Sequence, residues 1–250
     1  MKPYYLTTPI YYVNDKPHIG HAYTTLACDV LARFKRLDGY SVKFLTGTDE
    51  HGQKVQAAAE KAGVSPQEFT DTVSQNFRDL LVVMNFSNDQ FIRTTEPRHY
   101  KSCQAIWKRL MDKGFITLDK YEGWYSVRDE TFFTETELVD GKAPTGAPVS
   151  WVEEPSYFFN LSEWQQPLLD HYEANPDFIA PESKRKEVIS FVSGGLNDLS
   201  VSRTTFDWGV PVPGHPKHIM YVWLDALTNY ITALDWQEQG AEFERFWPAD

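Results

Sequence analysis

Residues 4–21 read YYLTTPIYYVNDKPHIGH, and this stretch decides the fold. Its first ten residues are rich in aromatic and β-branched side chains, which is typical of a buried strand. The turn formers at residues 14–17 end that strand. Apolar side chains then recur at steps of three and four residues, which predicts a helix that Gly39 closes. They are Ile19, Tyr23, Leu26, Val30, Phe34 and Leu37.

A second strand follows at residues 41–46 and leads into Gly47-Thr48-Asp49-Glu50-His51-Gly52. Strand, turn, helix and strand in this order form a βαβ unit, which begins a parallel sheet. Further helices are predicted at residues 53–62, at 65–84 and at 97–113. The second of these has a clear start, because Ser65 can cap it and Pro66 suits the first helical position.

The pattern changes after Gly114. Residues 115–133 indicate short strands with a turn at Gly123, and residues 140–148 a surface loop. Helices are expected at 161–172 and 181–194. The parent sheet is expected to resume at residues 218–223, with a helix from Asp225 to about Leu234.

These elements predict an α/β protein with a Rossmann-like parallel sheet and an inserted α+β connective domain. We expect the first part of the catalytic domain at residues 1–113. The insertion would then occupy 114–212, and the second part of the catalytic domain would begin at 213–250.

Composition fits a globular protein without membrane segments. No stretch approaches the ~18 apolar residues that a membrane span needs, and no leader sequence precedes the first strand, so we expect a cytoplasmic protein. Cys28 and Cys103 are not spaced like metal ligands and are interpreted as core residues. The net charge of −11 argues against a broadly basic nucleic-acid surface. Any main electrostatic contacts with RNA must therefore be local or lie outside this chain.

The histidines of His18-Ile19-Gly20-His21 lie at a helix N-terminus, where free N–H groups and the helix dipole favour an anion. Because they are three residues apart, both imidazoles project from nearly the same face. Gly20 leaves room for a flat ring or a phosphate. Two such donors can stabilise charge on a phosphoryl group. The alternative is two exposed histidines beside a helix cap.

Asp49 follows the second strand. In a parallel α/β sheet, ligands bind outside the carboxyl ends of the strands, so Asp49 and the histidine pair are predicted on one rim. A carboxylate there can hold a cation such as an α-ammonium group, although it can also be a helix cap.

An aromatic segment, residues 221–230, supplies a third candidate feature. Trp223 is expected to end a strand, with Tyr230 two helical turns later. Together with Ile10 and Tyr12 they can wall an apolar pocket suited to a thioether. The alternative is that these aromatic residues are plain core.

Four motifs, in order along the chain, resemble the N-terminal portion of methionyl-tRNA synthetases, a family of class I aminoacyl-tRNA synthetases. They are residues 8–14 leading into 18–21, residues 47–52, residues 197–203 followed by 208–213, and residues 221–226. The resemblance spans essentially the whole chain. It implies that ATP and methionine condense to methionyl-adenylate and pyrophosphate, and that the methionyl group then passes to tRNA(Met).

The resemblance also implies roles for individual residues. His18 and His21 would contact the ATP phosphates, with Gly20 packed near the nucleotide. Asp49 would bind the methionine ammonium group. Magnesium would accompany ATP through its phosphates rather than through a protein cage. The side-chain pocket would be shaped by Ile10, Tyr12, Trp223, Ala226, Leu227 and Tyr230.

The chain departs from the family pattern in two respects. Ser126 stands where many relatives carry a zinc-binding cysteine in the inserted domain, so we expect no metal and a zinc-free subgroup. The second ATP motif, a lysine-rich KMSKS-type loop, would lie beyond Asp250, as would the rest of the sheet, part of the methionine pocket and the anticodon-binding domain. We therefore expect an N-terminal part that is not active alone.

Two other functions stay open on the sequence. One is a different nucleotidyltransferase or synthetase with the same histidine motif, acting on another substrate. The other is a module that binds methionine or a nucleotide without turnover.

Overall fold

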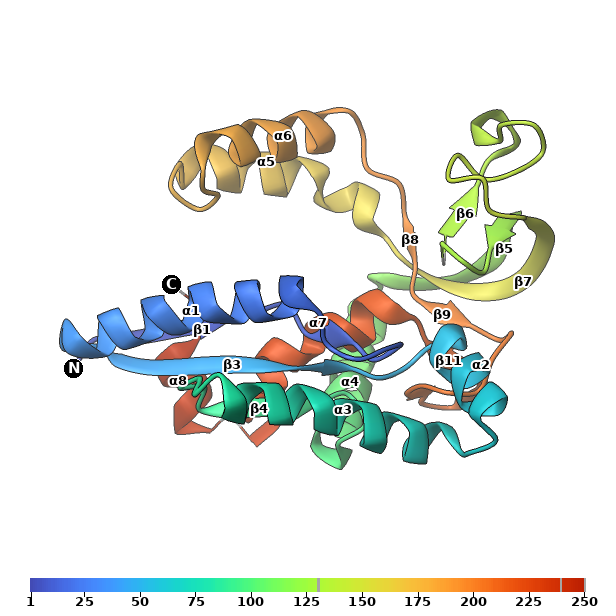
Figure 1. Ribbon diagram of the computed structural model, residues 1–250. Coiled ribbons are helices and arrows are strands. Elements are labelled where there is room, and N and C mark those ends of the chain that lie inside the picture. The colour runs from blue at the N-terminus through green and yellow to red at the C-terminus, as the bar shows by residue number, and fades with distance from the viewer. Residues whose placement is uncertain (130, 239, 250) are drawn as a thin grey trace.

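A parallel sheet forms the centre of the main body in the computed structural model, which describes residues 1–129, 131–238 and 240–249 (Figure 1). Its strands are β1 (Pro3–Thr7), β2 (Tyr11–Tyr12), β3 (Ser41–Asp49) and β4 (Gln90–Arg93). β3 is central, because β1 and β2 pair with one of its edges and β4 with the other. All three pairings are parallel, so the expected α/β sheet is confirmed.

Helices α1 (Ile19–Leu37), α2 (Gln53–Ala62), α3 (Pro66–Val83) and α4 (Pro97–Asp112) surround this sheet. Their bounds follow the predicted ones closely, because the caps are local. The Ser65 hydroxyl accepts a hydrogen bond from the Glu68 amide at 3.2 Å, with Pro66 at the first position of α3. None of the helices in the described ranges is long and apolar enough to cross a membrane.

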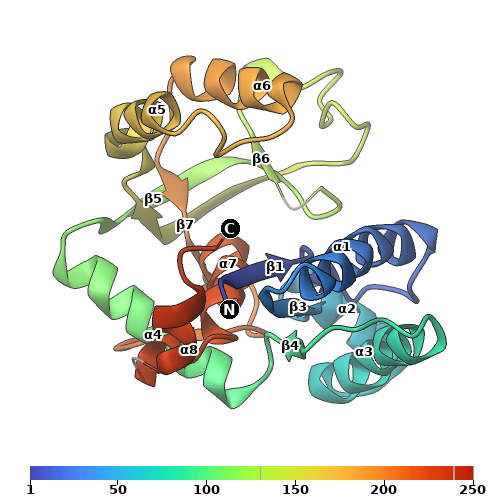
Figure 2. The same cartoon turned by 90° about the vertical axis from the view of Figure 1, so that its left-hand side faces the viewer.

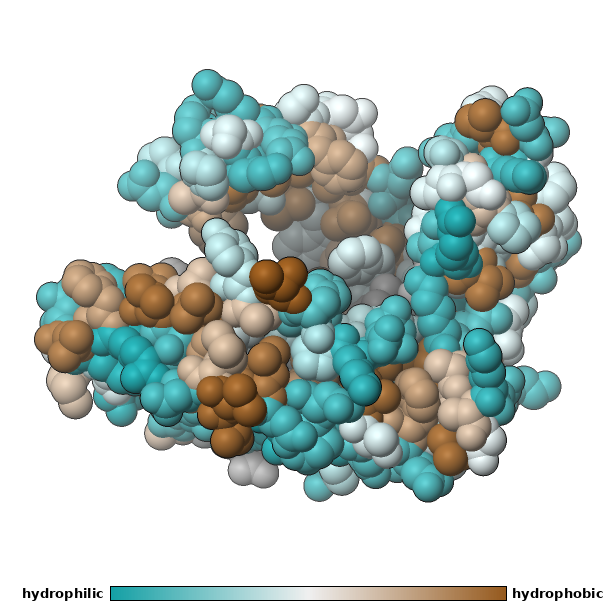
Figure 3. Space-filling view, in the orientation of Figure 1, coloured by the Kyte–Doolittle hydropathy of each residue, from teal (hydrophilic) through white to brown (hydrophobic). Residues whose placement is uncertain are grey.

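The apolar stripe of α1 does not face the sheet. Such a stripe normally packs on a core, yet the buried residues of α1 are Thr25, Asp29 and Ala32. Asp29 anchors this polar side, since its carboxylate accepts hydrogen bonds of 2.6 Å from both the amide and the hydroxyl of Ser87. The stripe residues are exposed: Ile19, Tyr23, Leu26, Val30, Phe34 and Leu37. Figure 3 shows brown, apolar residues exposed along α1.

We expect stripe substitutions to leave the stability of the 250-residue chain almost unchanged. Val30 and Phe34 are 60% and 58% exposed, so replacing either with lysine should alter the free energy of unfolding by less than about 0.5 kcal/mol. Phe77→Ala is the contrasting variant, because Phe77 is buried against Tyr11 and Val13, and it should cost about 3–5 kcal/mol. Urea unfolding measures both; a large loss for Phe34→Lys would mean that the stripe is packed in this chain.

The inserted domain is built on an antiparallel sheet of order β6-β5-β7-β8. Its strands are β5 (Ile116–Ser126), β6 (Thr131–Phe133), β7 (Ser150–Phe159) and β8 (Leu199–Ser200). The predicted turn at Gly123 is wrong: β5 is continuous, and Gly123 pairs with Val152 inside it. Pairing along the length of β7 outweighs the local turn preference of glycine.

Short helices complete the insertion. η1 (Glu135–Glu137) follows β6, and η2 (Leu161–Trp164) leads into α5 (Gln165–Ala174) and α6 (Glu182–Ser193), as expected for the two helical segments. Figures 1 and 2 show α5 and α6 side by side above the main body, on the side of α1. The exact domain boundaries stay a prediction.

The chain then forms a third, small sheet instead of returning to the first. β9 (Ser202–Arg203), β10 (Pro211–Val212) and β11 (His215–Met220) pair antiparallel. The prediction that residues 218–223 resume the parallel sheet is therefore wrong for the described residues. Gly214, with φ of 77°, allows the tight turn that pairs Val212 with His215.

Helix α7 (Val222–Thr232) begins directly after β11, so Trp223 lies in a helix rather than at the end of a strand. η3 (Trp236–Glu238) and α8 (Ala241–Phe246) follow. α8 packs on the parallel sheet, since Phe246 shares a core cluster with Tyr5 and Leu45. An ion pair of 2.8 Å between Lys43 and Glu242 supports the same contact.

Candidate functional site

The two histidines at the start of α1 cap the helix with each other. The Nδ1 atom of His18 accepts a hydrogen bond from the Gly20 amide, and the Nδ1 atom of His21 accepts one from the His18 amide, both at 3.1 Å. The rings are stacked, with 3.8 Å between their centroids. Because each Nδ1 is an acceptor, the proton of each neutral ring is on Nε2, which is then a donor.

Gly20 makes room for this arrangement. A Cβ atom there would lie 2.9 Å from Cε1 of His18, so the glycine first accommodates the neighbouring imidazole. The sequence had predicted the glycine for an approaching ligand. Its contact with a nucleotide stays a prediction.

His21 is held by aromatic residues from two other elements. Its ring lies 4.7 Å from Tyr11 of β2 and 5.2 Å from Phe77 of α3, centroid to centroid. Burial lowers the pKa of His21, and the neighbouring His18 lowers it further. A neutral His21 that donates from Nε2 is thus favoured.

Asp49 is the last residue of β3, at the carboxyl edge of the sheet, and it pairs with Tyr12 of β2. Both side chains border a pocket at this edge, as expected from the parallel-sheet rule. The pocket is lined by Tyr12, Asp49, His51, Gly52, Phe206, Met220, Tyr221 and Asp225. Burial raises the pKa of the Tyr230 hydroxyl, and the charge of Asp49 also raises it.

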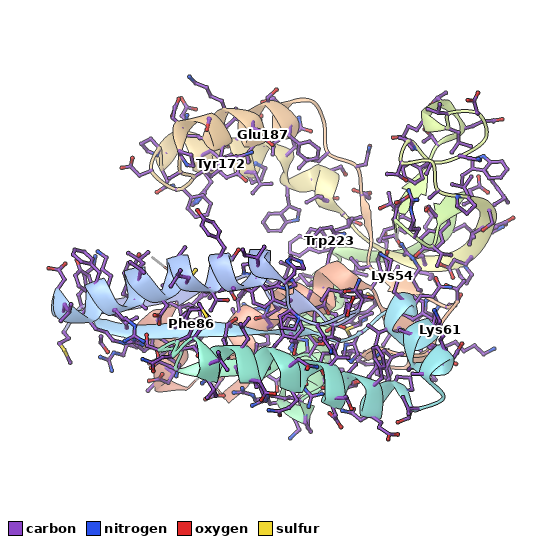
Figure 4. The ribbon with its side chains drawn as sticks, viewed as in Figure 1. Lys54, Lys61, Phe86, Tyr172, Glu187 and Trp223 are labelled. Atoms are coloured by element: carbon purple, nitrogen blue, oxygen red, sulfur yellow. The ribbon has the colours of Figure 1, made fainter. Side chains whose placement is uncertain are left out.

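The other predicted pocket residues divide into two groups. Ile10 and Tyr230 pack together against the core cluster around Tyr5 and Leu45. Trp223 and Leu227 are 51% and 55% exposed. They border a separate apolar groove between α7 and the inserted domain, where Figure 4 labels Trp223. Ala226 is half-buried on α7 between these groups. The structure therefore brings Tyr12 and Asp49 together and leaves Trp223 and Leu227 on another surface.

Sequence reasoning missed a buried network at the same pocket. The Asp225 carboxylate receives His51 Nδ1 at 2.6 Å and His99 Nε2 at 2.8 Å. The other ring nitrogen of His51 lies 2.9 Å from the Tyr100 hydroxyl. We call these four residues the Asp225 network. His51 and Asp225 lie within the motifs at residues 47–52 and 221–226, but their contact with each other and with His99 could not be seen in the sequence, because these residues come from distant elements.

The Asp225 network carries charge inside the protein. Burial by itself raises the pKa of Asp225, but the charge and hydrogen bonds of His51 and His99 hold it well below its usual range. Burial lowers the pKa of His51, yet Asp225 outweighs this and raises it, with Asp49 and Glu50 adding to the effect. Their contact thus favours the ionised form of Asp225 and the protonated form of His51.

Cys103 is buried beside this network, as expected for a core cysteine, whereas Cys28 is half-buried. In the described ranges, His99, Cys103 and Asp225 are a group whose ligand atoms lie within 4.8 Å of one another. These atoms are already hydrogen-bonded, with 3.2 Å from Cys103 Sγ to His99 Nε2. Burial raises the pKa of the Cys103 thiol, and the charge of Asp225 raises it further. The geometry is that of a hydrogen-bonded cluster.

Glu50, between Asp49 and His51, is fixed by a second buried interaction. Its carboxylate receives two hydrogen bonds from Arg93, at 2.7 and 2.8 Å, and one from Thr48 at 2.6 Å. Glu50 and His51, the two residues that follow Asp49, are therefore both hydrogen-bonded to side chains of other elements.

A family model described as tRNA synthetases class I (M) matches residues 4–149 and 137–250. The chain belongs to this family. Among curated members, the methionine–tRNA ligase of Rickettsia conorii is 64% identical over 248 residues, which cover 99% of this chain and 49% of the relative. That of Mesorhizobium japonicum is 59% identical, covering 98% and 49%. The chain spans about half the length of these class I relatives.

Solved structures of the family agree with the fold. Mycobacterium tuberculosis methionyl-tRNA synthetase in complex with methionyl-adenylate superposes with a TM-score of 0.95 at 57% identity, covering all of this chain and 50% of that one. The apo form of the same enzyme gives a TM-score of 0.83 at 54% identity, covering 100% and 49%. The predicted class I synthetase fold is confirmed.

Proposed function

We propose that this chain is the N-terminal part of an enzyme that activates methionine with ATP and transfers it to tRNA(Met). The observation that carries the proposal is the identity of 64% to a methionine–tRNA ligase across 99% of the chain. The site supports it, because the histidine pair and Asp49 both follow carboxyl ends of the parallel sheet, β2 and β3. The second half of the enzyme would supply the remaining parts.

In the first step a methionine carboxylate oxygen attacks the α-phosphorus of ATP. The new bond joins that oxygen to phosphorus, the bond between the α-phosphorus and the bridging oxygen breaks, and pyrophosphate leaves. The Nε2 donors of His18 and His21, with the N-terminus of α1, would stabilise the charge on the phosphoryl oxygens. Magnesium enters with ATP as the partner of its phosphates.

Asp49 would receive the methionine ammonium group. The carboxylate at the strand end supplies the negative charge, and the aromatic rings of Tyr12 and Tyr230 beside it suit the thioether side chain. Ile10, Ala226, Leu227 and Trp223 would complete this pocket. Trp223 and Leu227 face a separate groove in this chain. We therefore propose that residues from the second half of the enzyme complete the pocket beside them.

We also propose that the inserted domain holds no zinc. At the end of β5 the Ser126 hydroxyl donates to the Asp129 carboxylate at 2.8 Å, and the Thr145 hydroxyl donates to the same carboxylate at 2.6 Å. This hydrogen-bonded turn occupies the position where the family pattern has a ligand cysteine. Its oxygens already have partners, which supports a zinc-free domain.

Amino-acid-dependent exchange between ATP and pyrophosphate, measured on the full-length protein, tests the function. Methionine should drive the exchange. Asp49→Asn should lower kcat/KM for methionine by about 30-fold or more, because loss of one partner of a buried charge pair costs at least ~2 kcal/mol. The KM for ATP should stay unchanged.

Asp112→Asn is the matched control, since Asp112 is an exposed carboxylate at the end of α4, and it should behave like the wild type. Exchange driven by another substrate and not by methionine would favour a different nucleotidyltransferase. Tight, Asp49-dependent methionine binding by the 250-residue chain without exchange by the full-length protein would favour a binding module.

A further inference from the structure

Asp225 connects three elements that meet at the pocket. It lies in the first turn of α7, and its carboxylate holds His51 from the segment after β3 and His99 from α4. Its side chain is only 2% exposed. Tyr100, also from α4, completes the set by its contact with His51. A single carboxylate therefore fixes α7 and α4 against the carboxyl end of β3.

A buried ion pair is a costly way to hold three elements together. Replacing such a pair with well-packed apolar residues is often neutral or stabilising, so stability alone does not account for its chemistry. The Asp225 network lies beside Asp49, where the charge and the position of each side chain would affect binding of an ammonium group. His51 and Asp225 both border the pocket that contains Asp49.

Asp225 adds a second carboxylate to the pocket that contains Asp49. Asp49 and Asp225 are two carboxylates, with the His51 imidazole held on Asp225 at 2.6 Å. This hydrogen bond fixes the orientation of the His51 ring beside Asp49. Without the Asp225 carboxylate, His51 would lose the hydrogen bond that fixes its ring, and a reoriented imidazole two residues beyond Asp49 would disturb the place that the ammonium group takes.

We propose that Asp225 is a positioning residue for the methionine site: it holds His51 and His99 so that Asp49 stays directed at the ammonium group of the amino acid. The inference rests on the proposed function and adds to it. The Asp225 carboxylate already holds His51 and His99. It acts through His51, two residues beyond Asp49, and through α7, which carries Trp223 and Ala226.

The test uses the full-length enzyme with Asp225→Asn, which keeps the shape and removes the charge. We expect the KM for methionine in the exchange reaction to rise by up to about 100-fold, because a misplacement of about 1 Å at a reacting centre can cost about that factor. The KM for ATP should change less than twofold. Inhibition by L-methioninol, which keeps the ammonium group and lacks the carboxylate, should weaken to a similar degree.

His99→Gln is the second variant, because glutamine can still donate to Asp225, and it should raise the KM for methionine only a few-fold. Ile116→Ala controls for stability. Ile116 is buried at the base of the inserted domain, so this change should lower the melting temperature while leaving both KM values unchanged.

The outcomes separate the two proposals. If Asp225→Asn lowers the melting temperature like Ile116→Ala but leaves the methionine KM and methioninol inhibition within twofold, Asp225 is only structural. If Asp225→Asn does not fold, an unchanged methionine KM in His99→Gln overturns the inference equally. If the wild type lacks methionine-dependent exchange, the proposed function fails and this inference fails with it.

Discussion

Arg93→Met should lower the free energy of unfolding by about 3–5 kcal/mol, because it leaves a buried carboxylate without its cation. Glu50 is 0% exposed, and Arg93 provides two of its hydrogen bonds, at 2.7 and 2.8 Å. The Thr48 and Thr95 hydroxyls also donate to this carboxylate, but they carry no positive charge. Urea denaturation of the 250-residue chain, monitored by tryptophan fluorescence, measures the loss.

Two comparisons isolate the cause. Arg98→Met removes a guanidinium from an ion pair with Glu96, but Arg98 is 39% exposed, so the expected cost is below about 1 kcal/mol. The double variant Arg93→Met with Glu50→Gln removes both charges and should recover much of the lost stability. If the two single effects simply add in the double variant, the pair is not coupled and the explanation fails.

The segment that contains Glu50 shows which part of the site could be predicted. Asp49 was found because a general rule places ligand groups at the carboxyl ends of parallel strands. The partners of its neighbours could not be found, since Arg93 lies 43 residues from Glu50 and Asp225 lies 174 residues from His51. No local pattern records such pairs; they follow from how the elements pack.

Helix α1 shows the same division between local and tertiary information. Its bounds could be predicted because periodicity and the His18 cap depend only on nearby residues. The face of α1 that packs on the sheet could not be predicted, because the buried Asp29 is hydrogen-bonded to Ser87, 58 residues away. An apolar stripe predicts a helix whether or not the described chain covers it.

The error at residues 218–223 has a different origin. A continuous run of apolar and aromatic residues fits a strand in either sheet, and the pairing partner depends on the turn at Gly214 and on β9. The start of α7 at Val222 was missed because β-branched and aromatic residues favour strands only weakly. Burial of Asp225 in the first helical turn outweighs that preference.

Gly47→Ala should have an effect as large as Arg93→Met. Gly47 pairs with Ile92 across β3 and β4. A Cβ atom there would lie 2.1 Å from the Ile92 carbonyl oxygen and 2.7 Å from its Cγ2 atom. Because the nearest atom belongs to the backbone, β4 has to move and give up pairing. We expect a loss of about 3 kcal/mol or more in urea unfolding.

Gly240→Ala is the matched control for the glycine change. A Cβ atom at Gly240 would meet nothing closer than Asp235, at 3.5 Å, so the cost should stay within about 1 kcal/mol. Adding Ile92→Ala to Gly47→Ala removes Cγ2 but leaves the carbonyl oxygen in place, so stability should not recover. Recovery would show that the Ile92 side chain, rather than the sheet backbone, is what requires glycine beside the strand end that carries Asp49.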